Sequence, residues 1–155
     1  MDGRKVVDIY IDTSIKGPKR QNGAALFILA FVASTGKTAD RGQWIQKEDT
    51  TENHLTLLAL EAALKHLIKA CYLVIHLECS YVAAAIQNGW LQDWQKNGWQ
   101  TAKKKPVRDA EIWQSILSLL EKHEFEVELG KEHTYRAWMK RELERKRQRK
   151  GEHNV

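Results

Sequence analysis

The spacing of apolar residues first changes near Thr51, from that of strands to that of a helix, and this change limits the fold more than any other feature. Residues 6–13 alternate between apolar and polar side chains, as in a half-buried strand. Further strands are expected over 24–34 and 38–46, joined by a tight turn. After Thr51 the apolar residues recur at helical spacing. Three strands followed by alternating helices and strands predict an α/β domain.

The second part of the chain is expected to add helices and two more strands. Thr51 and Glu52 form a polar start that suits a helix N-terminus. The expected elements are a helix over 51–70, a strand over 72–78, a helix over 81–88, a helix over 109–123, a strand over 125–129 and a basic helix from 135 onward. With no repeat or linker, 1–143 is expected to form one domain, and 144–155 a basic tail that continues the last helix.

Length and composition are typical of a single globular unit. The chain has 155 residues, and 43% of them are hydrophobic, which is enough for a sizeable core. It has no apolar run of the length that a signal peptide or a bilayer crossing needs, so we expect a cytoplasmic chain with no membrane partner. A monomer is the expected oligomeric state. Cys71 and Cys79 lack the spacing of a metal site, which favours buried free thiols.

Positive charge is concentrated in two segments. Residues 95–108 contain five basic side chains and no acidic one, and residues 140–150 contain seven basic and two acidic side chains. Each segment carries +5, so the net +5 of the whole chain leaves −5 for the remainder. Such segments favour a polyanion, whose phosphates they neutralise with release of counterions. For 140–150, a solvated helix face is the alternative.

Two carboxylates stand where predicted strands end. Asp12 closes the first strand, and Glu78 closes the strand over 72–78. Ligands of open α/β sheets bind beyond the carboxyl ends of the strands, so both side chains are expected to face one site. Several carboxylates together hold a catalytic metal well, whereas one holds it poorly. Asp12 and Glu78 are therefore candidate metal ligands; taken alone, Asp12 is equally compatible with an Asx turn.

Four stretches of sequence resemble one family. They are "DIYIDTS" at 8–14, "RGQW" at 41–44, "KEHT" at 131–134 and, most specifically, "GWLQDWQKNGWQTAKKKPVRDAEIWQ" at 89–114. Along nearly its whole length the chain resembles ribonuclease H type 1. The resemblance implies a five-stranded mixed sheet flanked by helices, with a basic protrusion. It also implies an endonuclease that cuts the RNA strand of an RNA/DNA hybrid with two Mg²⁺ or Mn²⁺ ions.

The resemblance also locates the four acids of that family, and two of them are missing. Asp12 matches the first acid, and Glu78, in "LECSYV", replaces the Asp at the end of the fourth strand. Thr56, in "ENHLTL", stands at the position of the helix Glu. Arg141, in "KRELE", aligns with the last Asp, with Glu142 beside it. We therefore expect a degenerate site in which Mg²⁺ or Mn²⁺ binds weakly or not at all.

Other acids offer a route to an active enzyme. Glu52 lies one helical turn before Thr56, and a register shift before the last helix would bring Glu142 to the site. His133, in "KEHT", matches a loop histidine to which the resemblance assigns proton transfer or product release. The catalytic candidates are Asp12, Glu78, Glu142 and His133.

Candidate nucleic-acid contacts lie in three places. By resemblance, Asn53 matches an asparagine that contacts the minor groove of the hybrid. Lys19 and Arg20 add positive charge to the loop after the first strand. The candidates in the protrusion are Trp90, Trp94, Lys96, Trp99, Lys103, Lys104 and Lys105. For the tryptophans, the alternative is that they form a small local core. The three consecutive lysines cannot be part of a core.

The leading hypothesis is a ribonuclease H-like protein that binds RNA/DNA hybrid or duplex and whose hybrid endoribonuclease activity is weakened or lost. One alternative is an active hybrid ribonuclease with relocated carboxylates. The other is an interaction module with a vestigial cleft.

Overall fold

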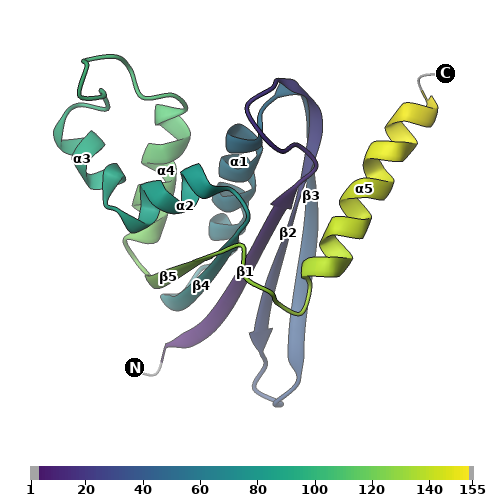
Figure 1. Ribbon diagram of the computed structural model, residues 1–155. Helices are drawn as coiled ribbons and strands as arrows, with labels where there is room; N and C mark the ends of the chain where they lie inside the picture. The colour runs from purple at the N-terminus through teal and green to yellow at the C-terminus, as the bar shows by residue number, and fades with distance from the viewer. Residues whose placement is uncertain (1–3, 154–155) are drawn as a thin grey trace.

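A mixed sheet of five strands organises the chain, in the order β3-β2-β1-β4-β5 (Figure 1). The structure, a computed structural model, describes the backbone of residues 4–153 and the side chains of residues 4–147. The strands are β1 (Lys5–Thr13), β2 (Gln21–Val32), β3 (Thr38–Thr50), β4 (Cys71–Leu77) and β5 (Glu124–Leu129). The helices are α1 (Glu52–Lys65), α2 (Ser80–Gln87), α3 (Trp90–Lys96), α4 (Ala110–Leu120) and α5 (Arg136–His153). The expected α/β fold with a five-stranded mixed sheet is confirmed.

Strand direction changes across β1. This strand pairs antiparallel with β2, which pairs antiparallel with β3, whereas β1 and β4, and β4 and β5, are parallel. The register sets Tyr10 of β1 level with His76 of β4. The carboxyl ends of β1 and β4 therefore meet at the same edge of the sheet.

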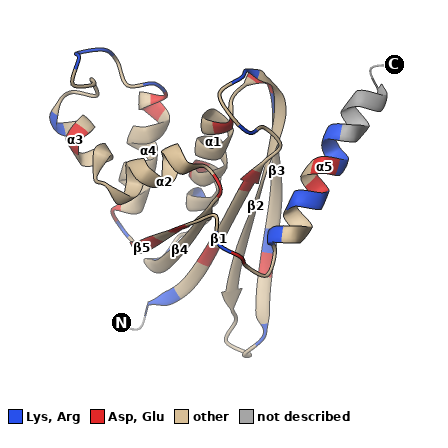
Figure 2. Ribbon diagram, in the orientation of Figure 1, with Lys and Arg blue, Asp and Glu red and all other residues tan. Residues whose placement is uncertain are grey.

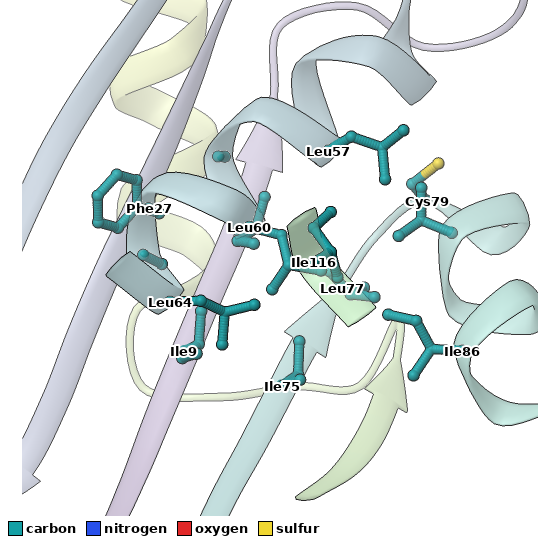
Figure 3. Close-up of a cluster of buried hydrophobic side chains, with 14 of the residues drawn as sticks. Ile9, Phe27, Leu57, Leu60, Leu64, Ile75, Leu77, Cys79, Ile86 and Ile116 are labelled. Atoms are coloured by element: carbon teal, nitrogen blue, oxygen red, sulfur yellow. The ribbon is translucent and has the colours of Figure 1, made fainter. Parts of the chain in front are cut away.

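The two faces of the sheet are covered differently. The main core lies under α1 to α4, where Ile9 of β1, Phe27 of β2 and Ile75 of β4 belong to one buried cluster with Leu60 and Leu64 of α1 (Figure 3). Helix α5 covers the other face alone, as Figure 1 shows, with Met139 and Leu143 in a smaller apolar cluster. Because side chains alternate between faces, the even-numbered residues of β1 point toward the α5 side.

Several element boundaries differ from expectation, and two of them differ by more than three residues. The helix expected over 51–70 ends at Lys65; Thr51 caps its start, accepting the His54 N–H at 3.2 Å. The residues from His66 onward form a tightened last turn and the link to β4. Strand β3 extends past the expected 46 to Thr50, because backbone pairing with β2 continues along a solvent-exposed edge where no apolar pattern is needed.

The short helix α3 was not expected. It spans fewer than two turns and follows Gly89, whose φ of +72° suits glycine, so it carries little periodic signal. The thiols of Cys71 and Cys79 are free and buried, as expected. Helix α5 continues through 153; residues 154–155 of the expected tail lie outside the described residues. In the described part of the chain, each helix is too short or too polar to cross a bilayer.

Candidate functional site

Asp12 and Glu78 lie side by side at the edge where β1 and β4 end. Asp12 is the penultimate residue of β1, and Glu78 directly follows β4. Since Tyr10 is level with His76, two further residues along each strand bring both carboxylates level and onto the same face. Both are largely buried, with 4% and 12% of their side chains exposed.

Three cations surround these carboxylates, and we call Lys16, Arg136 and Lys140 the cation cluster. Lys16 Nζ donates a hydrogen bond to Asp12 Oδ1. Arg136 donates to both oxygens of Glu78, at 3.1 Å from Nε and 2.9 Å from Nη2. Lys140 Nζ lies 3.6 Å from Asp12 Oδ2 and 3.6 Å from Glu78 Oε1, so it bridges the two acids.

The cation cluster compensates for the burial of the acids. A buried carboxylate without a partner is strongly unfavourable. Burial by itself raises the pKa of Glu78, but the hydrogen bond from Arg136 and the charge of Lys140 outweigh it. The pKa of Glu78 therefore lies below its ordinary value of 4.5, and this carboxyl is ionised at neutral pH.

Thr56 and Glu52 add no metal ligand beside this pair. Thr56 is buried, and its hydroxyl donates to the Glu52 carbonyl at 2.8 Å, within its own helix. The Glu52 carboxylate accepts the Gly17 N–H at 3.1 Å, from the loop after β1. The Thr56 hydroxyl, at the position where the family has its helix Glu, is thus hydrogen-bonded to the backbone of its own helix.

The residue of α5 that reaches the acids is Lys140, which corrects the expectation for Arg141. Arg141 is exposed, and none of the ion pairs among the described side chains joins it to Asp12 or Glu78. Neighbouring helix residues point about 100° apart, so a shift of one position redirects the side chain. Glu142, a catalytic candidate, pairs instead with Arg145 at 2.9 Å.

The side chains at this edge do not fit a two-metal centre. Such a centre needs several carboxylates free to bind metal ions. Here both carboxylates of the pair are held by cations, and an ammonium lies between them. Among the residues whose side chains are described, no group of three or more His, Cys, Asp or Glu is arranged to hold a metal ion.

His133 lies beside this edge in an aromatic cluster. Its ring centroid is 4.4 Å from that of Tyr10 and 5.3 Å from that of His76. Burial, followed by the charge of His76, lowers the pKa of His133, which favours the neutral ring. His76 is itself fixed by Asp8, at 2.9 Å from Nε2. A neutral imidazole near Glu78 can accept or donate a proton through water.

The tryptophans of the protrusion, residues 89–109, form a local core. Trp94 lies 6.1 Å from Trp90, 6.4 Å from Trp99 and 5.6 Å from Trp113, between ring centroids. Trp113 of α4 is fully buried, while the other three are half-buried. This packing is the alternative that the sequence left open for Trp90, Trp94 and Trp99.

Three lysines occupy the tip of the protrusion. The Thr101 N–H donates to the Lys105 carbonyl at 2.7 Å, and the Lys104 N–H to the Thr101 carbonyl at 2.8 Å, which closes a tight turn. Lys103, Lys104 and Lys105 are all exposed, and so is Lys96 at the end of α3. The turn therefore presents consecutive ammonium groups to solvent.

The remaining binding candidates lie near the start of α1. Asn53 is half-buried, and its Oδ1 accepts a hydrogen bond from the Cys79 thiol at 3.1 Å. Lys19 and Arg20 are exposed in the loop after β1, where Arg20 pairs with Asp49 at 3.0 Å. In Figure 2 the cations of this loop, of the protrusion and of α5 lie toward the end where β1 terminates.

Sequence reasoning missed Arg136 and Lys140 as partners of the acids. They are four residues apart, so they share one side of α5, and Met139 and Leu143 share the adjacent apolar side. That spacing was visible in the sequence, but the position of α5 against the sheet was not.

A family model described as RNase H matches residues 4–137. Over 138 residues the chain is 35% identical to a ribonuclease H of Chlorobium chlorochromatii, covering 89% of this chain and 90% of that protein. Over 134 residues it is 33% identical to a ribonuclease HI of Pseudomonas aeruginosa strain PAO1, covering 86% of each.

Solved structures show the same fold. LC9-RNase H1, described as a type 1 RNase H with the type 2 active-site motif, matches with a TM-score of 0.69 and 21% identity over 84% of this chain and 65% of that chain. The PFV RNase H domain matches with a TM-score of 0.60 and 23% identity over 84% and 82%. A foamy viral protease-reverse transcriptase in complex with RNA/DNA hybrid matches with a TM-score of 0.59 and 20% identity over 83% of this chain and 18% of that chain.

Proposed function

The chain belongs to the ribonuclease H family, and from this premise we propose that it binds RNA/DNA hybrid or duplex while its hybrid-cleaving activity is lost or weak. The observation that carries the proposal is the pairing of Asp12 and Glu78 with the cation cluster. Hydrolysis by two metals depends on carboxylates that hold the ions. Carboxylates occupied by ammonium and guanidinium groups hold them poorly.

The distribution of exposed charge supports nucleic-acid binding. Lys103, Lys104 and Lys105 project from the protrusion, and Lys19 and Arg20 from the loop after β1. The ion pair of Arg20 with Asp49 is open to solvent, so it holds the guanidinium only weakly. Exposed cations on one end of a molecule favour contacts to a phosphate backbone. A foamy viral structure of the same fold is a complex with RNA/DNA hybrid.

The first test is a cleavage assay with a labelled RNA/DNA hybrid in Mg²⁺ or Mn²⁺, paired with a binding measurement on the same substrate. Binding with slow or no cleavage is expected of the wild type. Rapid cleavage that is lost in Glu52→Gln or Glu142→Gln would instead identify an active enzyme with relocated carboxylates.

The second test restores the acids. Thr56→Glu, Glu78→Asp and Lys140→Asp together place four carboxylates at the edge of the sheet, counting Asp12, and remove the bridging cation. This variant is expected to cleave the hybrid in Mg²⁺, since it regains the anions that two-metal hydrolysis needs.

The matched control for restoration replaces Lys140→Asp by Arg141→Asp and keeps the other two substitutions. It adds the same charge change one residue further along α5, where the side chain is exposed. It is expected to stay inactive, because Lys140 remains between the acids. Wild type cutting as fast as the restored variant would contradict the proposed loss.

A further inference from the structure

The ammonium group of Lys140 lies between the two acids, where a bound metal ion would also place its positive charge. Its ammonium lies 3.6 Å from an oxygen of Asp12 and 3.6 Å from an oxygen of Glu78. Metal ions at such an edge cancel the charge of the acids and attract phosphate. An ammonium held between two carboxylates also cancels their charge, because it places positive charge beside the same two groups.

The cation cluster exceeds the acid pair in charge. Three cations face two carboxylates at this edge, leaving an excess of one positive charge. Arg136 also lies 3.8 Å from Glu132, but that carboxylate is exposed, so solvent screens the pair. We call this edge, with Asp12, Glu78 and the cation cluster, the cleft. Its cations compensate both carboxylates and leave one positive charge over.

The ammonium groups also remain reachable from solvent. The side chains of Lys16 and Lys140 are 51% and 47% exposed. Both line a hollow of about 220 Å³ beside Asp12, which is also bordered by Arg147 and Glu144, an ion pair at 3.2 Å that adds no net charge. A lysine ammonium has three donors, and its contacts with the acids do not require all of them. Donors are thus left for an incoming anion.

We propose that the cation cluster replaces the metal ions in substrate binding, so that the cleft holds a phosphodiester group of the nucleic acid without a divalent metal. This inference rests on the proposed function and specifies how the same site binds. The ligand is the phosphate backbone of the hybrid or duplex. Contacts of this kind position a nucleic acid and carry no base specificity.

The test measures binding of the full chain to a fluorescently labelled RNA/DNA hybrid by anisotropy, in EDTA and in Mg²⁺ at matched ionic strength. The wild-type Kd is expected to agree between the two buffers within about twofold. Gel analysis of the Mg²⁺ samples shows whether the hybrid stays intact, which concerns the proposed function alone.

The decisive variant is Lys140→Gln. It removes the bridging charge, so it is expected to weaken binding in EDTA by about tenfold. Mg²⁺ should then recover part of the affinity, because Asp12 Oδ2 loses its cation partner, while Arg136 still holds both oxygens of Glu78. Arg141→Gln is the matched control, with the same charge change at an exposed position, and its small effect should be equal in both buffers.

Two outcomes overturn the inference and leave hybrid binding standing. One is a wild type that binds only with Mg²⁺. The other is a Lys140→Gln variant that matches Arg141→Gln in both buffers. Failure of the wild type to bind in either buffer would refute the proposed function, and the inference with it.

Discussion

The cleft and the protrusion both carry clustered cations, but these cations face different surroundings. In the cleft, Arg136 and Lys140 point at buried carboxylates. In the protrusion, Lys103 to Lys105 point to solvent from a turn supported by packed tryptophans. The first group is paired with the acids and keeps only part of its hydrogen-bond donors for a partner, whereas the second is open to solvent.

This difference separates two tasks that a nuclease combines. A buried acid pair must be compensated, either by metal ions or by protein cations, because unpaired buried charge is costly. Hydrolysis by two metals is possible only where metal ions, and not protein cations, compensate the acids. Exposed lysines carry no such constraint, so under the proposed function the contacts of the protrusion with nucleic acid do not depend on which cation compensates the acids.

The largest expected effect comes from removing the support of the protrusion. Trp113→Ala is expected to destabilise the chain by about 3–5 kcal/mol, as typical for a buried Trp. Urea unfolding measures the loss. Trp138→Ala, at a site 43% exposed on α5, is the control and should cost much less. Similar losses in the two variants would contradict the assigned role of the tryptophan cluster.

Charge removal at the tip of the protrusion sharpens the comparison. Replacing Lys103, Lys104 and Lys105 by Ala should weaken hybrid binding and lower the slope of log K against log salt by up to about 2.7, at about 0.9 for each lost phosphate contact. Anisotropy titrations over a range of salt measure this slope.

A matched triple variant controls for net charge. Lys37, Lys69 and Lys122 are exposed near the opposite end of the sheet, where β1, β4 and β5 begin. Their replacement by Ala removes the same charge and should leave the slope nearly unchanged. An equal decrease in both triple variants would mean that total charge, and not the protrusion, governs binding.

The smallest effect is expected from pH, and it reports on the cleft. Because its pKa is lower in the folded chain, Glu78 stabilises the fold above its ordinary value of 4.5, and this contribution is lost as the pH falls through the folded value. Glu78→Gln should therefore lose less stability than wild type on acidification below about pH 4.5. Urea unfolding at a series of pH values measures the difference; parallel curves would show that Arg136 and Lys140 do not hold the carboxylate.

The order of the elements other than α3, and the meeting of Asp12 with Glu78, were predictable from the sequence. Alternation identified β1, and an apolar run identified β4, each with an acid where the strand stops. Parallel neighbours place such residues at one edge whatever the details of packing. The local pattern of apolar residues was therefore sufficient to predict these two strands and the position of their acids.

The partners of those acids were not predictable. Whether Lys140 or Arg141 faces the sheet depends on how Met139 and Leu143 seat α5 against β1 and β2, which is a long-range packing effect. Matching the short stretch "KRELE" to the family motif leaves the position of the side chain open by one residue there. The tryptophans pose a similar problem, since a local core and a stacking surface require the same residue type at the same spacing.

The attachment of α5 gives the molecule one region of low local stability. Among the described side chains, a small apolar cluster packs this helix against the sheet, and charged groups add to it: Arg136 and Lys140 at its start, and Lys146 over the ring of Trp44 at 4.3 Å. Ion pairs weaken with added salt, whereas the main core under the other helices does not. Local unfolding of α5 is therefore expected to require less free energy than unfolding of the main core, and it would leave the two acids exposed together on an otherwise intact sheet.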